Sequence, residues 1–163
     1  MVENHPAVSR VRAEFEQRNL PFELRIFEEG THTAVAAADA LGVVTGQIAS
    51  SIVFKLVTND VESPLLVITS GQHRVDTAKV ASHLGVEKLH RADADFVRNA
   101  SGFAIGGVAP VGWSEKPRAL IDVALMPYDS IWAAAGHPYT VFETSFEQLL
   151  LLAEAEPLDV GQH

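Results

Sequence analysis

Apolar residues recur at helical spacing near the start of the chain. Val8, Val11 and Phe15 lie three and four positions apart, which predicts a first helix that ends before Pro21. Polar caps followed by glycine or proline stops predict four more helices. These are residues 33–41 between Thr33 and Gly42, the segment from Asp76 to Gly85, the segment from Asp93 to Gly102, and a last helix that begins with a Thr144–Glu147 capping box and is closed by Pro157.

Other segments alternate apolar and polar positions or are rich in strand-forming residues, which predicts β-strands. They are residues 22–27, 51–57, 65–69, 119–125, 131–134 and 139–142. The turn-forming stretch 59–64 joins two of these strands, so we expect a hairpin there. Strands and helices do not alternate regularly. This order favours an α+β fold with a largely antiparallel, curled sheet over a doubly wound parallel one.

Composition fits one globular domain over residues 1–163, since no repeat, linker or low-complexity tract interrupts the chain. The chain has no cysteine, which excludes disulfides, thiolate nucleophiles and Cys-ligated zinc. No apolar run reaches the ~18 residues of a membrane span, and the N-terminal residues lack the apolar core of a signal peptide. We therefore expect a cytoplasmic protein with no membrane partner.

The net charge of −9 argues against tight, sequence-independent binding to a nucleic-acid backbone, and we expect no DNA partner. The charge is unevenly distributed. Residues 71–120 hold seven Lys and Arg against five Asp and Glu, whereas residues 121–163 hold seven acidic residues and no Lys or Arg. The middle segment is the stretch best suited to face a phosphate backbone, although ordinary scatter explains the distribution equally well.

Several kinds of chemistry lack their sequence motifs. No His-x-His pair, His-Glu-x-x-His motif or other closely spaced metal-ligand set occurs, so we expect no metal. We interpret His83 and His90 as structural residues on a helix face and a following strand. The motifs for a serine nucleophile elbow, a P-loop and a dinucleotide-binding turn are also missing, so we expect no cofactor.

The segment 102–112, GFAIGGVAPVG, combines four glycines and a proline with large apolar side chains. Adjacent Gly106 and Gly107 permit backbone conformations closed to other residues and let a ligand approach the main chain. Peptide N–H groups displayed in this way stabilise the oxyanion of an acyl-transfer reaction. The alternative is a tight turn packed on a strand. Gly136 and His137 form a second glycine turn that carries a polar side chain.

The glycine loop resembles the signature loop of the YbaK/prolyl-tRNA-synthetase-associated domain family of aminoacyl-tRNA editing domains. Three further stretches are similar to the family in the family's order, so that the resemblance runs from about residue 22 to 152. They read THTAVAAADALGVVTGQIASSIVFK, SGQHRVDTAKVASHLGVEKLHRADADFV and IWAAAGHPYTVFETSFEQLL.

This resemblance implies a curled, mainly antiparallel, barrel-like sheet flanked by helices, and hydrolysis of mischarged aminoacyl-tRNA without a metal or cofactor. The implied partners are the 3′ end of aminoacyl-tRNA and an aminoacyl-tRNA synthetase. The residues at matching positions are Gly106, Gly107 and Ser50 for catalysis, and Phe27, Pro110, Gly112, Gly136 and His137 for substrate binding.

Ser50 departs from the family pattern, because members typically carry a lysine at this position. Lys55 matches only a distal basic residue, and strand alternation over five positions places it on the opposite face, roughly 16 Å away. Two functions follow as hypotheses. One is an editing hydrolase, favoured by the intact glycine loop; the other is a non-catalytic module that binds a tRNA end, a nucleotide or a synthetase, favoured by the missing lysine and the acidic surface.

Overall fold

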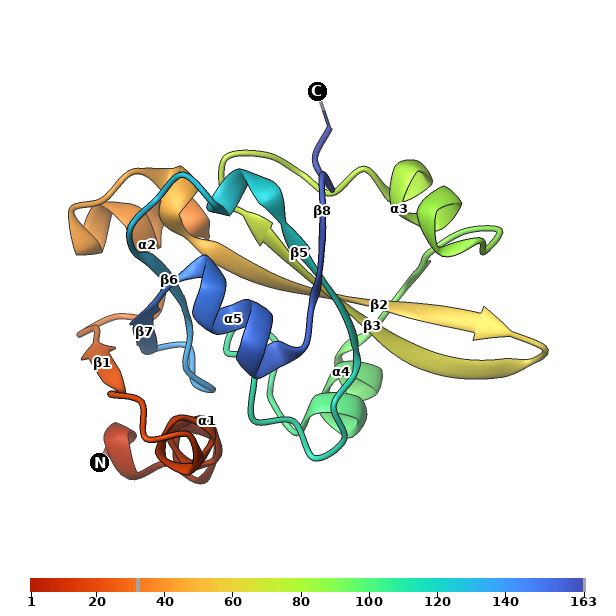
Figure 1. The fold of residues 1–163 in the computed structure, drawn as a ribbon. Helices are drawn as coiled ribbons and strands as arrows, with labels where there is room; N and C mark the ends of the chain where they lie inside the picture. Colours follow the sequence, from red (N-terminus) through yellow and green to blue (C-terminus); the bar gives the residue numbers. More distant parts are fainter. Residues whose placement is uncertain (32, 163) are drawn as a thin grey trace.

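The structure is a computed structural model that describes residues 1–31 and 33–162. Over these residues, five α-helices and eight strands are arranged as Figure 1 shows. The helices are α1 (Pro6–Gln17), α2 (Ala34–Leu41), α3 (Thr77–Leu84), α4 (Ala94–Ser101) and α5 (Phe146–Ala153). The strands are β1 (Glu23–Ile26), β2 (Ala49–Thr58), β3 (Val61–Ser70), β4 (His90–Arg91), β5 (Arg118–Asp122), β6 (Ile131–Ala134), β7 (Thr140–Thr144) and β8 (Glu156–Leu158). Short 3-10 helices are η1 (Val2–Asn4), η2 (Thr45–Gln47) and η3 (Val123–Leu125).

The strands form two sheets, in the orders β1-β7-β6 and β4-β2-β3-β5-β8. The small sheet and the β4-β2-β3 part of the large sheet are antiparallel, whereas β5 pairs in parallel with both β3 and β8. The α+β fold with mainly antiparallel pairing is therefore confirmed. The prediction of a single barrel-like sheet is wrong. The strands form two separate sheets, which are linked by an isolated β-bridge between Ile48 and Trp132. Among the described residues, no helix has the length and apolar character needed to cross a membrane.

The main core joins α1 and α5 to the inner faces of both sheets, and the glycine-rich segment 102–112 runs through it. Phe103, Ala109 and Val111 are buried among core residues of α1, β3 and α5. Arg10 of α1 donates hydrogen bonds to the carbonyl oxygens of Gly102 (2.8 Å) and Gly112 (3.3 Å). The apolar residues of this segment thus belong to the core, and α1 fixes its two ends.

Two predicted boundaries are wrong for local reasons. The hairpin turn contains only Asn59 and Asp60, both with positive φ, as a two-residue type I′ loop requires, and Pro64 lies within β3. The strand predicted over 119–125 ends at Asp122, because the Asp122 carboxylate accepts a hydrogen bond from the Ala124 N–H and begins η3.

The predicted capping box of the last helix is also wrong. Thr144 is the final residue of β7, and Ser145 is the N-cap, its hydroxyl accepting a hydrogen bond of 3.1 Å from the Gln148 N–H. Pro157 does not close this helix. The helix ends at Ala153, and Pro157 lies in β8.

This cap gives a simple test of stability. Replacing Ser145 by Ala leaves the Gln148 N–H without its acceptor, so we expect the free energy of unfolding to fall by about 1 kcal/mol. Exposed Glu147 should contribute a few tenths of a kcal/mol through the helix dipole alone. Urea unfolding of Ser145→Ala and Glu147→Ala measures both. Equal losses would instead support a capping role for Glu147.

Candidate functional site

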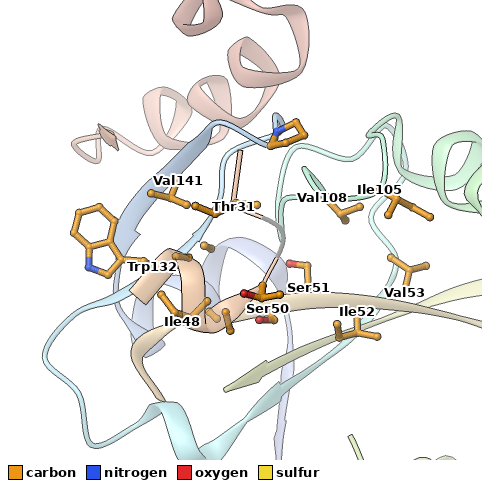
Figure 2. A pocket seen from close by; sticks show the side chains of 18 of the residues that line it. Thr31, Ile48, Ser50, Ser51, Ile52, Val53, Ile105, Val108, Trp132 and Val141 are labelled. Carbon is orange, nitrogen blue, oxygen red and sulfur yellow. The ribbon is translucent and has the colours of Figure 1, made fainter. Parts of the chain in front are cut away.

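A cavity of about 380 Å³ lies between the start of β2, the small sheet and the glycine loop. Figure 2 shows Trp132 on one side of this first cavity and Ile105 on the opposite side, with Ser51 of β2 between them. The cavity is mostly apolar. Among the described lining residues, the polar side chains belong to two serines and three threonines, namely Ser50, Ser51, Thr31, Thr33 and Thr140.

Ser50 and Ser51 take different places in the wall. Strand alternation puts Ser51 on the same face of β2 as Val53, which packs against the main core, and Ser50 on the opposite face. The hydroxyl oxygen of Ser51 is buried and has no hydrogen-bond partner among the described residues. An unpaired buried hydroxyl costs about 1–3 kcal/mol, so this atom is suited to a polar group of a bound ligand.

The glycine loop turns sharply at the rim of the cavity. The Gly107 N–H donates to the Ala104 carbonyl oxygen at 3.0 Å, and Gly106 has φ of +95°, the pattern of a type II turn that requires glycine at its third position. Gly106 lines the cavity and is exposed. Within the described residues its N–H donates no hydrogen bond, which leaves it available to a ligand.

Gly107 and His137 form the contact between the two glycine turns. A Cβ at Gly107 would lie 2.9–3.0 Å from backbone atoms of His137, so only glycine allows the two turns to approach this closely. The His137 Nδ1 accepts a hydrogen bond from the Tyr139 N–H, and its ring packs edge-on against that of His5. Burial, with a smaller contribution from His5, lowers the pKa of His137 below its ordinary value. Neither Gly107 nor His137 lines the first cavity.

The other predicted site residues lie outside the cavity wall. Phe27 packs with Trp132 and Val141 in a small cluster behind it. Pro110 and Gly112 lie at the far end of the loop, beside a void of about 10 Å³. Gly136, with φ of +103°, presses on α1, where a Cβ would stand 2.9 Å from the Ala7 backbone. The structure thus brings Ser50 and Gly106 together at the cavity and places the remaining residues around or behind it.

Lys55 lies on the face of β2 opposite Ser50, as strand alternation predicts, and on the same face as Ser51 and Val53 but beyond the wall of the first cavity. Its Nζ forms an ion pair of 2.8 Å with Glu62 and lies 5.7 Å from the centre of the Phe96 ring. The hydrogen bond to the Glu62 carboxylate raises the pKa of Lys55, which keeps the side chain charged and paired. Lys55 lines neither the first cavity nor its neighbour on the other face of β2.

No Asp, Glu, Lys, Arg or His is among the described residues that line the first cavity. Across residues 1–31 and 33–162, no three His, Asp or Glu residues lie together as metal ligands would. The site therefore offers backbone N–H groups, hydroxyls and apolar surface. The pattern of residues did not reveal Ser51, Thr31 or Trp132, because each reaches the cavity through pairing between distant segments.

Comparison with known proteins identifies relatives over most of the chain. A model of the family "Aminoacyl-tRNA editing domain" matches residues 28–152. The uncharacterized protein YwhH of Bacillus subtilis (strain 168) is 27% identical over 143 residues, 88% of each protein. The multifunctional Ser/Thr-tRNA deacylase ProXp-y of Escherichia coli (strain K12) is 29% identical over 115 residues, 68% of this chain and 69% of that protein. A crystal structure described as a candidate trans-editing enzyme for prolyl tRNA synthetase superposes with a TM-score of 0.85 at 34% identity, covering 97% of this chain and 98% of the other.

Proposed function

This chain belongs to the aminoacyl-tRNA editing domain family, and we propose that it hydrolyses the ester bond between a small amino acid and the 3′ end of a mischarged tRNA. The N–H of Gly106, which has no hydrogen-bond partner among the described residues and lies at the rim of an apolar cavity, is the observation that carries this proposal. The deacylase relative and the trans-editing neighbour support it, and the latter makes an aminoacyl-tRNA synthetase the expected protein partner.

The geometry supports a simple acyl-transfer mechanism. The amino-acid side chain enters the first cavity, whose wall contains Ala37, Ala49 and Ala133. Water attacks the ester carbonyl carbon, and the Gly106 N–H donates to the oxyanion that forms. The bond to the ribose oxygen then breaks. The ribose hydroxyl next to the ester passes the proton of the water to the leaving oxygen, which gives the free amino acid and tRNA.

Ser51 is placed to contribute to substrate choice. Its buried, unpaired hydroxyl can bind the ammonium group or a side-chain hydroxyl of the bound amino acid. From the family resemblance around the glycine loop, we expect a small amino acid such as alanine, serine, threonine or cysteine to be released.

A second function has one specific observation in its favour. Ser50 stands where family members typically carry a lysine, and the described wall of the cavity has no charged side chain. A binding module that recognises the tRNA end without cleaving it would tolerate the absence of that charge.

Single-turnover deacylation over a panel of mischarged tRNAs separates the two functions. We expect release of at least one small amino acid well above the rate without protein, and the same rate after exhaustive chelation, because the described residues offer no metal-ligand set. A control reaction must test separately whether chelation unfolds the tRNA, because tRNA can itself need magnesium to fold. If correctly folded protein left the deacylation rate of every tRNA in the panel equal to the rate without protein, the binding module would be the function.

A further inference from the structure

Arg10 of α1 closes the base of the glycine-rich segment 102–112. Its Nη2 donates to the carbonyl oxygen of Gly102 and its Nε donates to that of Gly112, the first and the last residue of the segment. A guanidinium group holds its donors in one rigid plane, so a single side chain sets the distance between the two ends of the loop. Gly112 is buried, and without Arg10 its carbonyl oxygen would lose this donor.

The same guanidinium also packs on the loop. Its Cζ lies 4.7 Å from the centre of the ring of Phe103, a residue that is 1% exposed. A cation over an aromatic face is attracted to it. Glycine at position 102 allows this approach, because a Cβ there would stand 2.7 Å from Arg10 Nη2. Among the described residues, Arg10 forms no ion pair with a carboxylate, so its charged group is committed to the loop.

Between its two ends the loop has a fixed part and an exposed part. Residues 107–113 are buried, and the Trp113 Nε1–H donates a hydrogen bond of 2.8 Å to the Ala109 carbonyl oxygen. Residues 104–106 are exposed and contain the turn in which the Gly106 N–H has no partner within the described chain. Because the chain on both sides of this turn is anchored, the contacts with α1 determine where that N–H points.

We propose that Arg10 is a positioning residue for deacylation, which holds the glycine loop so that the Gly106 N–H meets the oxyanion. This inference rests on the proposed function. Arg10 does not line the first cavity, so it acts through the loop and not on the substrate. A donor stabilises an oxyanion only where it is already aimed at it, and a misplacement of about 1 Å can cost a factor of roughly a hundred in rate.

Replacing Arg10 by Gln tests the proposal in the deacylation assay. We expect kcat to fall about tenfold, equivalent to 1.4 kcal/mol, with KM unchanged, because the loop donor acts in the transition state. Arg10→Lys keeps the stem and the charge but lacks the planar fork that reaches both carbonyl oxygens, so kcat should fall here too. This milder variant decides the question if Arg10→Gln does not fold.

Arg12→Gln is the matched control on the same helix. Arg12 donates a hydrogen bond of 2.9 Å to the Glu3 carbonyl oxygen, and its Cζ lies 5.5 Å from the centre of the Phe22 ring. It makes the same kinds of contact as Arg10, but away from the glycine loop. Both variants should lower the midpoint of urea unfolding, and Arg12→Gln should keep the wild-type kcat. A wild-type kcat in the Arg10 variants, or an equal fall in kcat in Arg12→Gln, would overturn the positioning role.

The fluorescence of Trp113 reports on the loop without any catalysis. In a Trp132→Phe background it is the only tryptophan of the chain, and it is 8% exposed in the native loop. We expect Arg10→Gln, unlike Arg12→Gln, to shift its emission to the red and to increase its quenching by acrylamide. If wild-type protein hydrolyses no tRNA of the panel, the proposed function fails, and increased quenching would then leave Arg10 a role in holding the loop alone. Hydrolysis by wild type, with unchanged kcat and unchanged quenching in Arg10→Gln, would overturn the inference alone.

Discussion

Replacing Gly106 by Ala is expected to slow deacylation about a hundredfold, the usual cost of losing one oxyanion donor. The reason is the backbone conformation. With φ of +95°, Gly106 holds the type II turn in which its N–H is left free at the cavity, and an L-residue there favours type I, which turns the central peptide by about 180°. A Cβ would find space, because its nearest neighbour is Pro138 Cγ at 3.7 Å. Single-turnover rates measure the effect.

Gly42→Ala is the matched control for this change. Gly42 ends α2 with φ of +72°, and nothing lies within 4 Å of a Cβ built on it. Both variants should therefore lose a similar free energy of unfolding, about 1–2 kcal/mol, from placing alanine at positive φ. Only Gly106→Ala should lose activity. Equal deacylation rates in the two variants would remove the Gly106 N–H from the mechanism.

The elements that the sequence predicted well are those defined by short-range signals. Asp76 and Asp93 each accept a hydrogen bond from the backbone N–H three residues on, and Gly85 and Gly102 end the same helices in the left-handed region, as predicted. Caps of this kind depend on a few neighbouring residues, so they can be recognised locally. The cap of α5 was missed by one residue, because Thr144 and Ser145 can both serve and the pairing of β7 with β6 decides between them.

The site was only partly predictable because its walls come from distant parts of the chain. The glycine loop was recognised from composition and resemblance, but Gly106 and Gly107 look alike in sequence. The turn shows that the Gly107 N–H is bonded to the Ala104 carbonyl oxygen, whereas the Gly106 N–H has no partner within residues 1–31 and 33–162. His73 and Asp122 are 49 positions apart and in contact, and no local pattern reveals this pairing.

The contacts of α1 with the glycine loops are also not predictable from local patterns. This helix lies before the range matched by the family model. Its backbone packs against Gly112 and Gly136, where a Cβ would stand 3.1 and 2.9 Å from backbone atoms of Val11 and Ala7. The sequence resemblance predicts a substrate-binding role for these two glycines, yet their close contacts are with α1 and neither lines the first cavity. Similarity alone could not separate a glycine that faces the substrate from one that lets a helix approach.

Replacing Ser50 by Lys is expected to speed hydrolysis or tighten binding about tenfold. Ser50 lines the first cavity, which receives the aminoacyl group in the proposed function. A lysine there adds a charge-assisted hydrogen bond, worth roughly 1.5–3 kcal/mol against about 1 for the neutral hydroxyl, and 1.4 kcal/mol corresponds to a factor of ten. Comparing kcat and KM of wild type and Ser50→Lys shows which of the two changes.

Lys55→Ala is the necessary counterpart, because it tests whether the chain already has a functional lysine. Its Nζ is bound to Glu62 and lies over Phe96, on the face of β2 opposite Ser50, so removing it should change catalysis little and cost some stability, since its stem no longer packs on the strand. Ser50→Ala should likewise be mild, since it removes only one neutral hydrogen-bonding group. If Lys55→Ala abolished deacylation while Ser50→Lys had no effect, Lys55 would be the functional lysine, and the ester would have to lie near Lys55 and Glu62 rather than beside Ser50.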